Sequence, residues 1–231
     1  MKRFALIGAA GFVAPRHMKA IRDTGNQRVA ALDPHDSVGV LDAHAPGCQF
    51  FTDRGGFIDF VRNASVDYMS VCSPNDLHVQ HCQVAMDLGA DAICEKPLAL
   101  TPWMLHELAN AEQRTGRRVW TILQLRLNPM LIALRERIIA AGRVGHVGLT
   151  YATPRGPWYA ASWKGDVGRS GGILSNIGIH MFDMLEWLFG PVVDGAIDRI
   201  RDNEASGYQA HRRCTGVHWS LTTNETRPPC R

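Results

Sequence analysis

Two glycines interrupt the apolar run at residues 4–14, and this feature constrains the fold more than any other in the chain. The run is predicted to begin as a buried strand, to turn at Gly8 and Gly11, and to continue as a helix from Ala14. Gly8 allows a tight turn, Gly11 allows a ligand to approach the backbone, and the small Ala14 allows close helix packing. The pattern predicts the opening of a dinucleotide-binding βαβ unit, with an ordinary glycine turn as the alternative.

An acidic residue ends the second predicted strand, which spans residues 28–33. This residue, Asp33, follows Gly8 by 25 positions, close to the spacing of a carboxylate that hydrogen-bonds the adenosine ribose of NAD. Position 35 is histidine, not the arginine that would meet the extra phosphate of NADP, so the pattern favours NAD. A helix-capping aspartate is the alternative. The other residues of this unit that we expect at the cofactor are Gly8, Ala10, Gly11, Phe12 and Val13.

Strands and helices alternate about every 25 residues in the first half of the chain. Further strands are predicted at residues 49–51, 66–72, 90–94 and 117–123, and helices at 56–62 and 78–86. Such alternation predicts a parallel, doubly wound sheet that binds ligands beyond the carboxyl ends of its strands. We therefore expect an α/β protein in which residues 1–123 form a NAD-binding Rossmann domain.

Two loops that follow predicted strands carry polar residues. Ser73, Asn75 and His78 follow the strand at 66–72, and Glu95-Lys96-Pro97 follows the strand at 90–94. Both loops are expected at the carboxyl edge of the sheet, where a bound nicotinamide lies. A lysine at that edge can transfer a proton, so Lys96 is a candidate catalytic residue.

Residues 124–231 are expected to form a second domain. Residues 124–129 are predicted to be the hinge, 130–141 have helix periodicity, and 146–153 alternate like a strand. The loop at 155–166 combines aromatic rings with cations, which suits stacking on a ring and binding phosphate or carboxylate. A solvated surface loop is the alternative.

Three polar residues, Asn176, His180 and Asp183, have the spacing i, i+4, i+7 and would share one face of a helix. His180 can then reach a substrate hydroxyl while Asp183 steadies the helix or the ring. Asn176 can only hydrogen-bond and orient, because an amide takes up no proton. A single histidine on a helix is more often a core residue, so the catalytic interpretation of His180 depends on its combination with Lys96.

Composition excludes several other classes of function. The chain is 45% hydrophobic and 20% charged, and its net charge of +3 is scattered without a basic stripe, so nucleic-acid binding is not expected. The six cysteines form no Cys-x-x-Cys pair and are expected to be reduced. No segment approaches the roughly 20 apolar residues of a membrane span. Lys2-Arg3 and the following apolar run imitate a secretory signal, but the strand and turn already explain that run, so a cytoplasmic location is expected.

The glycine turn, the Ser-Pro-Asn-x-x-His loop and Glu-Lys-Pro resemble, in that order, the motifs of the Gfo/Idh/MocA oxidoreductases. The resemblance implies that Lys96 contacts the nicotinamide ribose and the substrate. Residues 170–183 resemble the family signature Gly-Gly-x-Leu-x-Asp-x-Gly-x-His-x-x-Asp, in which Asn176 replaces the first Asp. Trp163-Lys164 resembles a Trp-Arg pair near the cofactor, although lysine lacks the planar fork of arginine. The further cofactor contacts that the resemblance implies are Ser73, Asn75, His78, Glu95, Lys96, Gln124, Trp163 and Lys164.

Within the family, the turn, residues 124–127, the loop at 155–165 and Asn176 are similar to the branch that oxidises the C3 hydroxyl of UDP-N-acetylglucosaminuronic acid. This resemblance implies a UDP-sugar acid as substrate, with His180 or Lys96 as the base, in surface-polysaccharide synthesis. It also implies that 2-oxoglutarate can reoxidise the cofactor. The substrate contacts expected on this basis are Lys96, Arg126, Arg155, Tyr159, Lys164, Asn176 and His180. No metal ligand is expected.

The resemblance reaches about Tyr208, and the tail from Gln209 shows little alternation. We expect a truncated or altered C-terminus and therefore an incomplete form of the family's open, mostly antiparallel second sheet, with Trp187, Leu188 and Phe189 left exposed. A homo-oligomer is expected if the second domain is intact. Two other functions stay open: a non-catalytic NAD-binding remnant, and a dehydrogenase of a free sugar or inositol.

Overall fold

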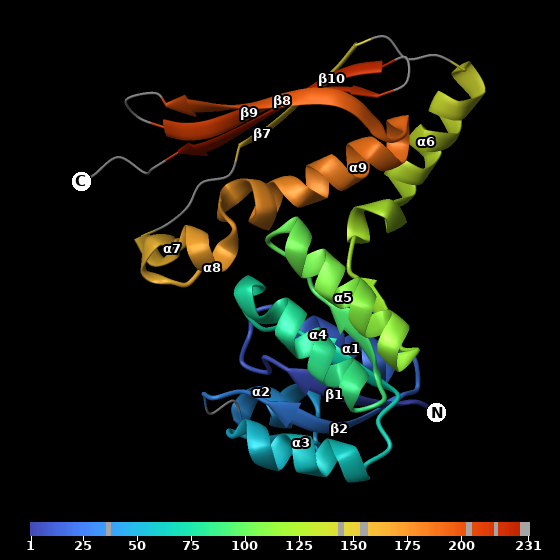
Figure 1. The fold of residues 1–231 in the computed structure, drawn as a ribbon, viewed down its shortest axis with the longest axis vertical. Coiled ribbons are helices and arrows are strands. Elements are labelled where there is room, and N and C mark those ends of the chain that lie inside the picture. Colours follow the sequence, from blue (N-terminus) through green and yellow to red (C-terminus); the bar gives the residue numbers. More distant parts are fainter. Residues whose placement is uncertain (36–37, 143–145, 153–156, 202–204, 215–216, 227–231) are drawn as a thin grey trace. The chain divides into compact units, whose positions relative to one another are not determined.

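The computed structural model describes residues 1–35, 38–142, 146–152, 157–201, 205–214 and 217–226 (Figure 1). From residue 193 onward the description is of the backbone. The chain forms two compact units, Met1–Ile122 and Leu123–Arg231. None of the helices in the described ranges is both long and apolar enough to cross a bilayer.

The N-terminal unit contains a six-stranded sheet with the order β3-β2-β1-β4-β5-β6. All neighbouring strands are parallel. The chain adds β2 and β3 on one side of β1 and then crosses to β4 on the other side, so the strand order reverses between β1 and β4. The predicted Rossmann sheet is confirmed. Its strands are β1 (Arg3–Ile7), β2 (Gln27–Leu32), β3 (Gln49–Phe51), β4 (Tyr68–Val71), β5 (Asp91–Cys94) and β6 (Val119–Thr121).

Two helices of this unit begin where the local sequence supplies a capping oxygen. Asp53 accepts a hydrogen bond from the Gly56 N–H at one helix start, and Thr101 accepts one from Met104 at another. Figure 1 shows α4 and α5 side by side. The helices are α1 (Ala14–Asp23), α2 (Val38–His44), α3 (Arg54–Asn63), the 3₁₀ turn η1 (Asn75–Leu77), α4 (His78–Asp87) and α5 (Pro102–Thr115).

The sheet is buried on both faces. Ala5 and Ile7 of β1 pack with residues of α3, α4 and α5, whereas Leu6 between them packs with residues of α1 and α2. Successive residues of a strand point to opposite faces, so this division places one helical layer on each face. The cysteines Cys72 and Cys94 are free and buried in these layers, as the sequence indicated.

The C-terminal unit contains a four-stranded sheet with the order β7-β10-β9-β8. Strands β8, β9 and β10 are antiparallel neighbours, and β10 is parallel to β7. The elements are η2 (Gln124–Leu127), α6 (Pro129–Ala141), β7 (His146–Ala152), α7 (Pro157–Ala161), α8 (Val167–Ser170), the π turn η3 (Leu174–Gly178), α9 (Ile179–Phe189), β8 (Val192–Arg201), β9 (Ala205–Cys214) and β10 (Val217–Thr226). An α+β domain with a mostly antiparallel sheet is therefore confirmed.

The tail takes part in this sheet. Strand β9 continues past Gln209 to Cys214, and β10 pairs with it residue by residue from Val217 to Thr226. Backbone ladder hydrogen bonds need no alternation of side chains, so the weak sequence pattern there gave little sign of these strands.

Helix α9 packs one of its faces into the unit. Leu185 is 1% exposed and contacts Phe189 on the same helix as well as Val147 and Leu149 of β7. Leu188 is also buried, and the Arg135 guanidinium lies 5.1 Å from the centre of the Trp187 ring. Leu188 is buried and Trp187 and Phe189 are half-buried, so the expected exposure of these three residues is wrong.

Candidate active site

The glycine turn packs directly against the end of β4. Gly8 has a φ of 86° and donates its N–H to the Leu32 carbonyl at 2.8 Å. A Cβ atom on Gly8 would lie 2.6 Å from the Cys72 backbone, and one on Gly11 would lie 3.0 Å from the Cys72 carbonyl. Only glycine permits this approach, which places the turn at the point where the strand order reverses.

The start of α1 suits an anion. Val13 at its N-cap makes no side-chain capping hydrogen bond, and no acidic residue occupies the first turn of this described helix. Helix N-terminal N–H groups and the helix dipole attract a pyrophosphate under these conditions. Ala10 and Phe12 of the turn are exposed. The residues present therefore fit the predicted dinucleotide.

Asp33 joins the ends of β1 and β2. One of its carboxylate oxygens accepts from the Ala10 N–H at 2.8 Å, and the other accepts from the His35 N–H at 2.9 Å. Each carboxylate oxygen can accept more than one hydrogen bond, so this arrangement remains compatible with binding a ribose. Asp33 thus fixes the turn as well as standing where a ribose-binding acid is expected.

The residues predicted after β4 lie inside the loop. Ser73, Asn75 and His78 are 7%, 4% and 1% exposed. The His78 ring lies between two carbonyls, with Nδ1 2.7 Å from the Pro97 oxygen and Nε2 2.8 Å from the Ser73 oxygen. Burial lowers the pKa of His78, and the two carbonyls oppose this effect. His78 therefore connects the loop after β4 to the Glu-Lys-Pro loop.

A second histidine of α4 holds the same loop. His81 Nδ1 lies 2.8 Å from the Ser73 hydroxyl. Burial, together with the nearby Arg54 charge, lowers the pKa of His81 to about 4, so the ring is neutral near pH 7. Sequence reasoning missed His81, although its i+3 spacing from His78 places both on neighbouring positions of one helix face.

The Glu-Lys-Pro loop continues directly from β5. The Glu95 N–H donates to the Val71 carbonyl at 3.0 Å, and Lys96 is half-buried beyond it. The Glu95 carboxylate lies 3.0 Å from His17 Nε2 on α1. Burial raises the pKa of Glu95, but the His17 hydrogen bond and the Lys96 charge outweigh it, so the net pKa is lowered.

The N-terminal unit therefore brings most of its predicted site residues to one edge of its sheet. The turn follows β1, and the two polar loops follow β4, which pairs with β1, and β5, which pairs with β4. His17 was missed as a member of this group. It lies three residues after Ala14, on the side of α1 that buries Met18 and Ile21, which is the available sequence signal.

In the C-terminal unit, Arg126 pairs with Asp183. The Arg126 Nε donates to the two carboxylate oxygens at 3.1 and 3.0 Å, and Nη2 donates as well. The hydrogen bonds to Asp183 raise the pKa of Arg126. The pair ties η2 to α9, so Asp183 does steady the helix, and part of the Arg126 fork is already engaged. Gln124 is exposed in the same turn.

Asn176 and His180 do not belong to one regular helix. Asn176 lies in the π turn at Leu174–Gly178 and is 7% exposed, whereas half-buried His180 is the second residue of α9. A π turn has a longer hydrogen-bonding repeat than an α-helix, so the regular α-helix expected through Asn176 is wrong. Such turns recur at functional sites.

The predicted cationic loop contains a lysine between two indoles. The Lys164 ammonium lies 5.5 Å from the centre of the Trp158 ring and 5.8 Å from that of Trp163. The Tyr159 ring meets Trp158 edge-on at 5.8 Å. The predicted stacking and cationic groups thus come together around Lys164. Arg155, also predicted to contact substrate, lies outside the described residues.

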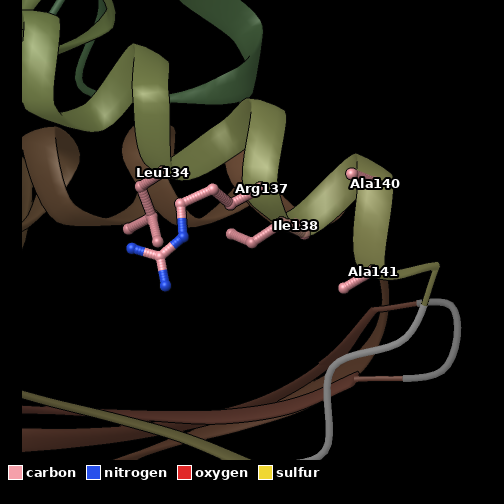
Figure 2. Close-up of a pocket in the computed structure, with 5 residues that line it drawn as sticks. All are labelled: Leu134, Arg137, Ile138, Ala140 and Ala141. Carbon is pink, nitrogen blue, oxygen red and sulfur yellow. The ribbon is translucent and has the colours of Figure 1, made fainter.

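An open depression on α6 contains none of the predicted site residues. Figure 2 shows the side chains of Leu134, Arg137 and Ile138 pointing to the same side of this helix. The remaining lining residues, Ala140 and Ala141, carry no group for proton transfer. We assign this depression no part in the candidate site.

Two family models cover most of the chain. Residues 2–123 match the oxidoreductase family's NAD-binding Rossmann fold (GFO_IDH_MocA), and residues 135–223 match the family's C-terminal alpha/beta domain. The chain belongs to the Gfo/Idh/MocA oxidoreductase family. The second match extends beyond Tyr208, where the recognisable motifs stop. The predicted family and NAD-binding domain are confirmed.

Curated relatives in this family act on different alcohols. Inositol 2-dehydrogenase of Rhizobium meliloti (strain 1021) is 30% identical over 81% of this chain and 55% of its own length. D-glucoside 3-dehydrogenase of Escherichia coli (strain K12) is 31% identical over 81% of this chain and 54% of its own length. The chain thus spans about half the length of these relatives.

A solved structure is more similar. The WlbA (WbpB) dehydrogenase from Thermus thermophilus, in complex with NAD and UDP-GlcNAcA, is 43% identical with a TM-score of 0.89, over 96% of this chain and 73% of that chain. A second structure of that enzyme, in complex with NAD and alpha-ketoglutarate, is 43% identical with a TM-score of 0.88 over the same shares.

Proposed function

We propose that the chain oxidises the C3 hydroxyl of UDP-N-acetylglucosaminuronic acid to a ketone, with NAD as the hydride acceptor. The likeness to the Thermus thermophilus dehydrogenase bound to NAD and UDP-GlcNAcA carries this proposal, because it extends over 96% of the chain at 43% identity. The other relatives named above support the reaction type, oxidation of a ring alcohol, but differ in substrate.

The N-terminal unit would hold the cofactor. Its turn at Gly8 and Gly11 and the start of α1 present N–H groups to the pyrophosphate, and Asp33 receives the adenosine ribose. The two polar loops, held in place by the hydrogen bonds of His78 and Glu95, would contact the nicotinamide half of NAD. NAD, when bound, supplies the acceptor for a hydride from C3.

Lys96 and His180 are the groups assigned to proton transfer. When C3 loses a hydride, the hydroxyl oxygen loses its proton to one of these two side chains in its neutral form, and the C3–O bond becomes a carbonyl. The ammonium of Lys96, when protonated, stabilises negative charge that develops on that oxygen. Asn176 lacks a titrating group and can only orient the sugar.

The C-terminal unit would bind the anionic parts of the substrate. A UDP-sugar acid carries a diphosphate and a carboxylate, and Lys164 offers a positive charge flanked by aromatic rings. Tyr159, Arg155 and the unengaged part of Arg126 complete the proposed substrate contacts of this unit, whereas Gln124 and Trp163 are proposed to contact the cofactor. The hydrogen bonds to Asp183 limit what Arg126 can contribute.

The wider setting follows from the same proposal. The second solved complex contains alpha-ketoglutarate, which supports 2-oxoglutarate as the oxidant that regenerates NAD. A 3-keto UDP-sugar acid suits surface-polysaccharide synthesis. We place the reaction in the cytoplasm and assign it to a homo-oligomer. The matches to inositol and glucoside dehydrogenases favour a free sugar or inositol as the second candidate substrate.

Absorbance at the NADH band tests the proposal. Purified protein is mixed with NAD and UDP-N-acetylglucosaminuronic acid while 2-oxoglutarate is withheld, and a rise is expected only with the UDP-sugar. Parallel reactions contain myo-inositol or a free glucoside. A rise with these alone would replace the proposed substrate, and no rise from protein that binds NADH would favour a non-catalytic NAD-binding remnant.

A further inference from the structure

A nearly buried histidine–carboxylate contact links α1 to the Glu-Lys-Pro loop. His17 Nε2 lies 3.0 Å from Glu95 Oε1, and the two side chains are 9% and 16% exposed. These residues are 78 positions apart in the chain. The contact is part of neither the glycine turn nor the predicted catalytic set, so its role needs a separate explanation.

The protonation of the pair follows from the environment of Glu95. The pKa of Glu95 is lowered by the hydrogen bond from His17 and by the Lys96 charge, despite the opposing effect of burial. An ionised carboxylate can only accept hydrogen bonds. The proton between the two side chains therefore resides on His17 Nε2, which donates to Glu95 in either the neutral Nε2–H tautomer or the cation.

Both the backbone and the side chain of Glu95 make hydrogen bonds. Its backbone N–H donates to the Val71 carbonyl at 3.0 Å, and its carboxylate accepts from the backbone N–H of Lys96 as well as from His17. The carboxylate thus connects the backbone of Lys96 to a side chain of α1. Because α1 begins at the glycine turn, the His17–Glu95 contact connects the helix of the proposed pyrophosphate site to the loop that contains Lys96.

We propose that His17 is a positioning residue that orients Lys96 by holding the Glu95 carboxylate. This inference rests on the proposed function only where turnover is measured, since the orientation of Lys96 is a property of the protein itself. His17 touches neither reacting atom in this assignment and acts through Glu95. A side chain that donates from the position of Nε2 is therefore sufficient for the role.

Two amide variants differ by one methylene and separate positioning from general destabilisation. In His17→Gln the amide nitrogen can reach the position of Nε2, whereas in His17→Asn it is too short to reach Glu95. Both variants keep a polar, uncharged side chain. His106→Asn, at an exposed position on α5, is the control for loss of a histidine elsewhere.

The first readout is the NMR signal of Lys96. The chain contains four lysines, Lys2, Lys19, Lys96 and Lys164, so ¹³C-methylated lysines give few signals, and Lys96→Arg assigns the one of interest. The Lys96 signal is expected to shift in His17→Asn and to stay near its wild-type position in His17→Gln and His106→Asn. An unchanged signal in folded His17→Asn, or equal shifts in both His17 variants, would overturn the proposal.

Kinetics supply the second readout. His17→Asn is expected to lower kcat by about 10- to 100-fold with KM for NAD within about threefold, because a misplaced reacting group costs rate more than binding. His17→Gln is expected to recover most of kcat. If the wild type has no activity with any substrate tested, the proposed function fails, and the NMR readout alone decides the role of His17.

Discussion

The two units position their candidate site residues in different ways. In the N-terminal unit, close backbone packing and buried side-chain hydrogen bonds shape the edge of the sheet where the cofactor is expected. Gly8 lies against Cys72, and the His78 ring lies between two carbonyls. In the C-terminal unit, the Arg126–Asp183 side-chain pair, whose arginine is 45% exposed, and a π turn place the polar groups. A site built on close-packed backbone tolerates few substitutions, whereas one built on side-chain pairs can change specificity without loss of the fold.

The largest expected effect concerns Lys96. Lys96→Met should lower the rate of hydride transfer by about 100- to 10,000-fold, because it removes a group for proton transfer and oxyanion stabilisation. NADH affinity, measured by fluorescence titration, should change little. His180→Asn, made in parallel, shows whether the C-terminal unit contributes equally. Unchanged turnover in Lys96→Met would remove the lysine from the mechanism.

Acid should destabilise the N-terminal unit through His81. Its pKa is about 4 in the fold and about 6.5 when unfolded, so the unfolded chain binds more protons between these values. Stability is therefore lost as the pH falls from about 6.5 to about 4, by at most about 3 kcal/mol from this group. Burial lowers the pKa of His78 too, so it acts in the same direction.

Urea unfolding at several pH values measures this loss. His81→Gln, which keeps a polar partner for Ser73, should flatten the dependence of the unfolding free energy on pH in that window. An equally steep dependence in His81→Gln would assign the effect to other groups.

A pair of glycine substitutions tests the backbone-built turn. Gly8→Ala should lower the unfolding free energy by about 2–3 kcal/mol, because the added Cβ meets the Cys72 backbone and φ is positive. Gly25→Ala has a similar φ of 72° with no atom within 4 Å of its Cβ, and should cost only about 1 kcal/mol. NADH binding should weaken in Gly8→Ala alone. Equal effects on stability and binding would show that the contact with β4 is unimportant.

The smallest expected effect concerns the Arg126–Asp183 pair. Its arginine is 45% exposed and its aspartate 10% exposed, so solvent screens the interaction, and a double-mutant cycle with alanine should give a coupling of about 1 kcal/mol. Arg126→Lys should lose most of this coupling, since lysine lacks the bidentate fork. Chemical denaturation of the four proteins measures it. A large rise in KM for the UDP-sugar in Asp183→Ala would show that the pair also serves substrate binding.

The sequence predicted the N-terminal unit well because its key positions depend on spacing. Gly8, Gly11 and Asp33 are fixed by backbone geometry within one βαβ unit, so their order and separation identify them. Four strands, β2 to β5, lie between His17 and Glu95 in the chain, and no local sequence pattern indicates a contact between residues so far apart.

The C-terminal unit was harder to predict for related reasons. A 3.6-residue period assumed for residues 176–183 missed the π turn, and the Arg126–Asp183 pair joins segments 57 residues apart. Strand β10 lies between β7 and β9, so its pairing depends on a parallel neighbour far back in the sequence. Such long-range pairing can form a strand even where side-chain alternation is weak.

The most direct test of the proposed reaction follows a single atom. UDP-N-acetylglucosaminuronic acid deuterated at C3 is mixed with the protein and NAD, and the NADH formed is examined by mass spectrometry. Transfer from C3 predicts NADH that carries the deuterium, formed more slowly than with unlabelled sugar. NADH without deuterium would contradict oxidation at C3 and assign the hydride to another position.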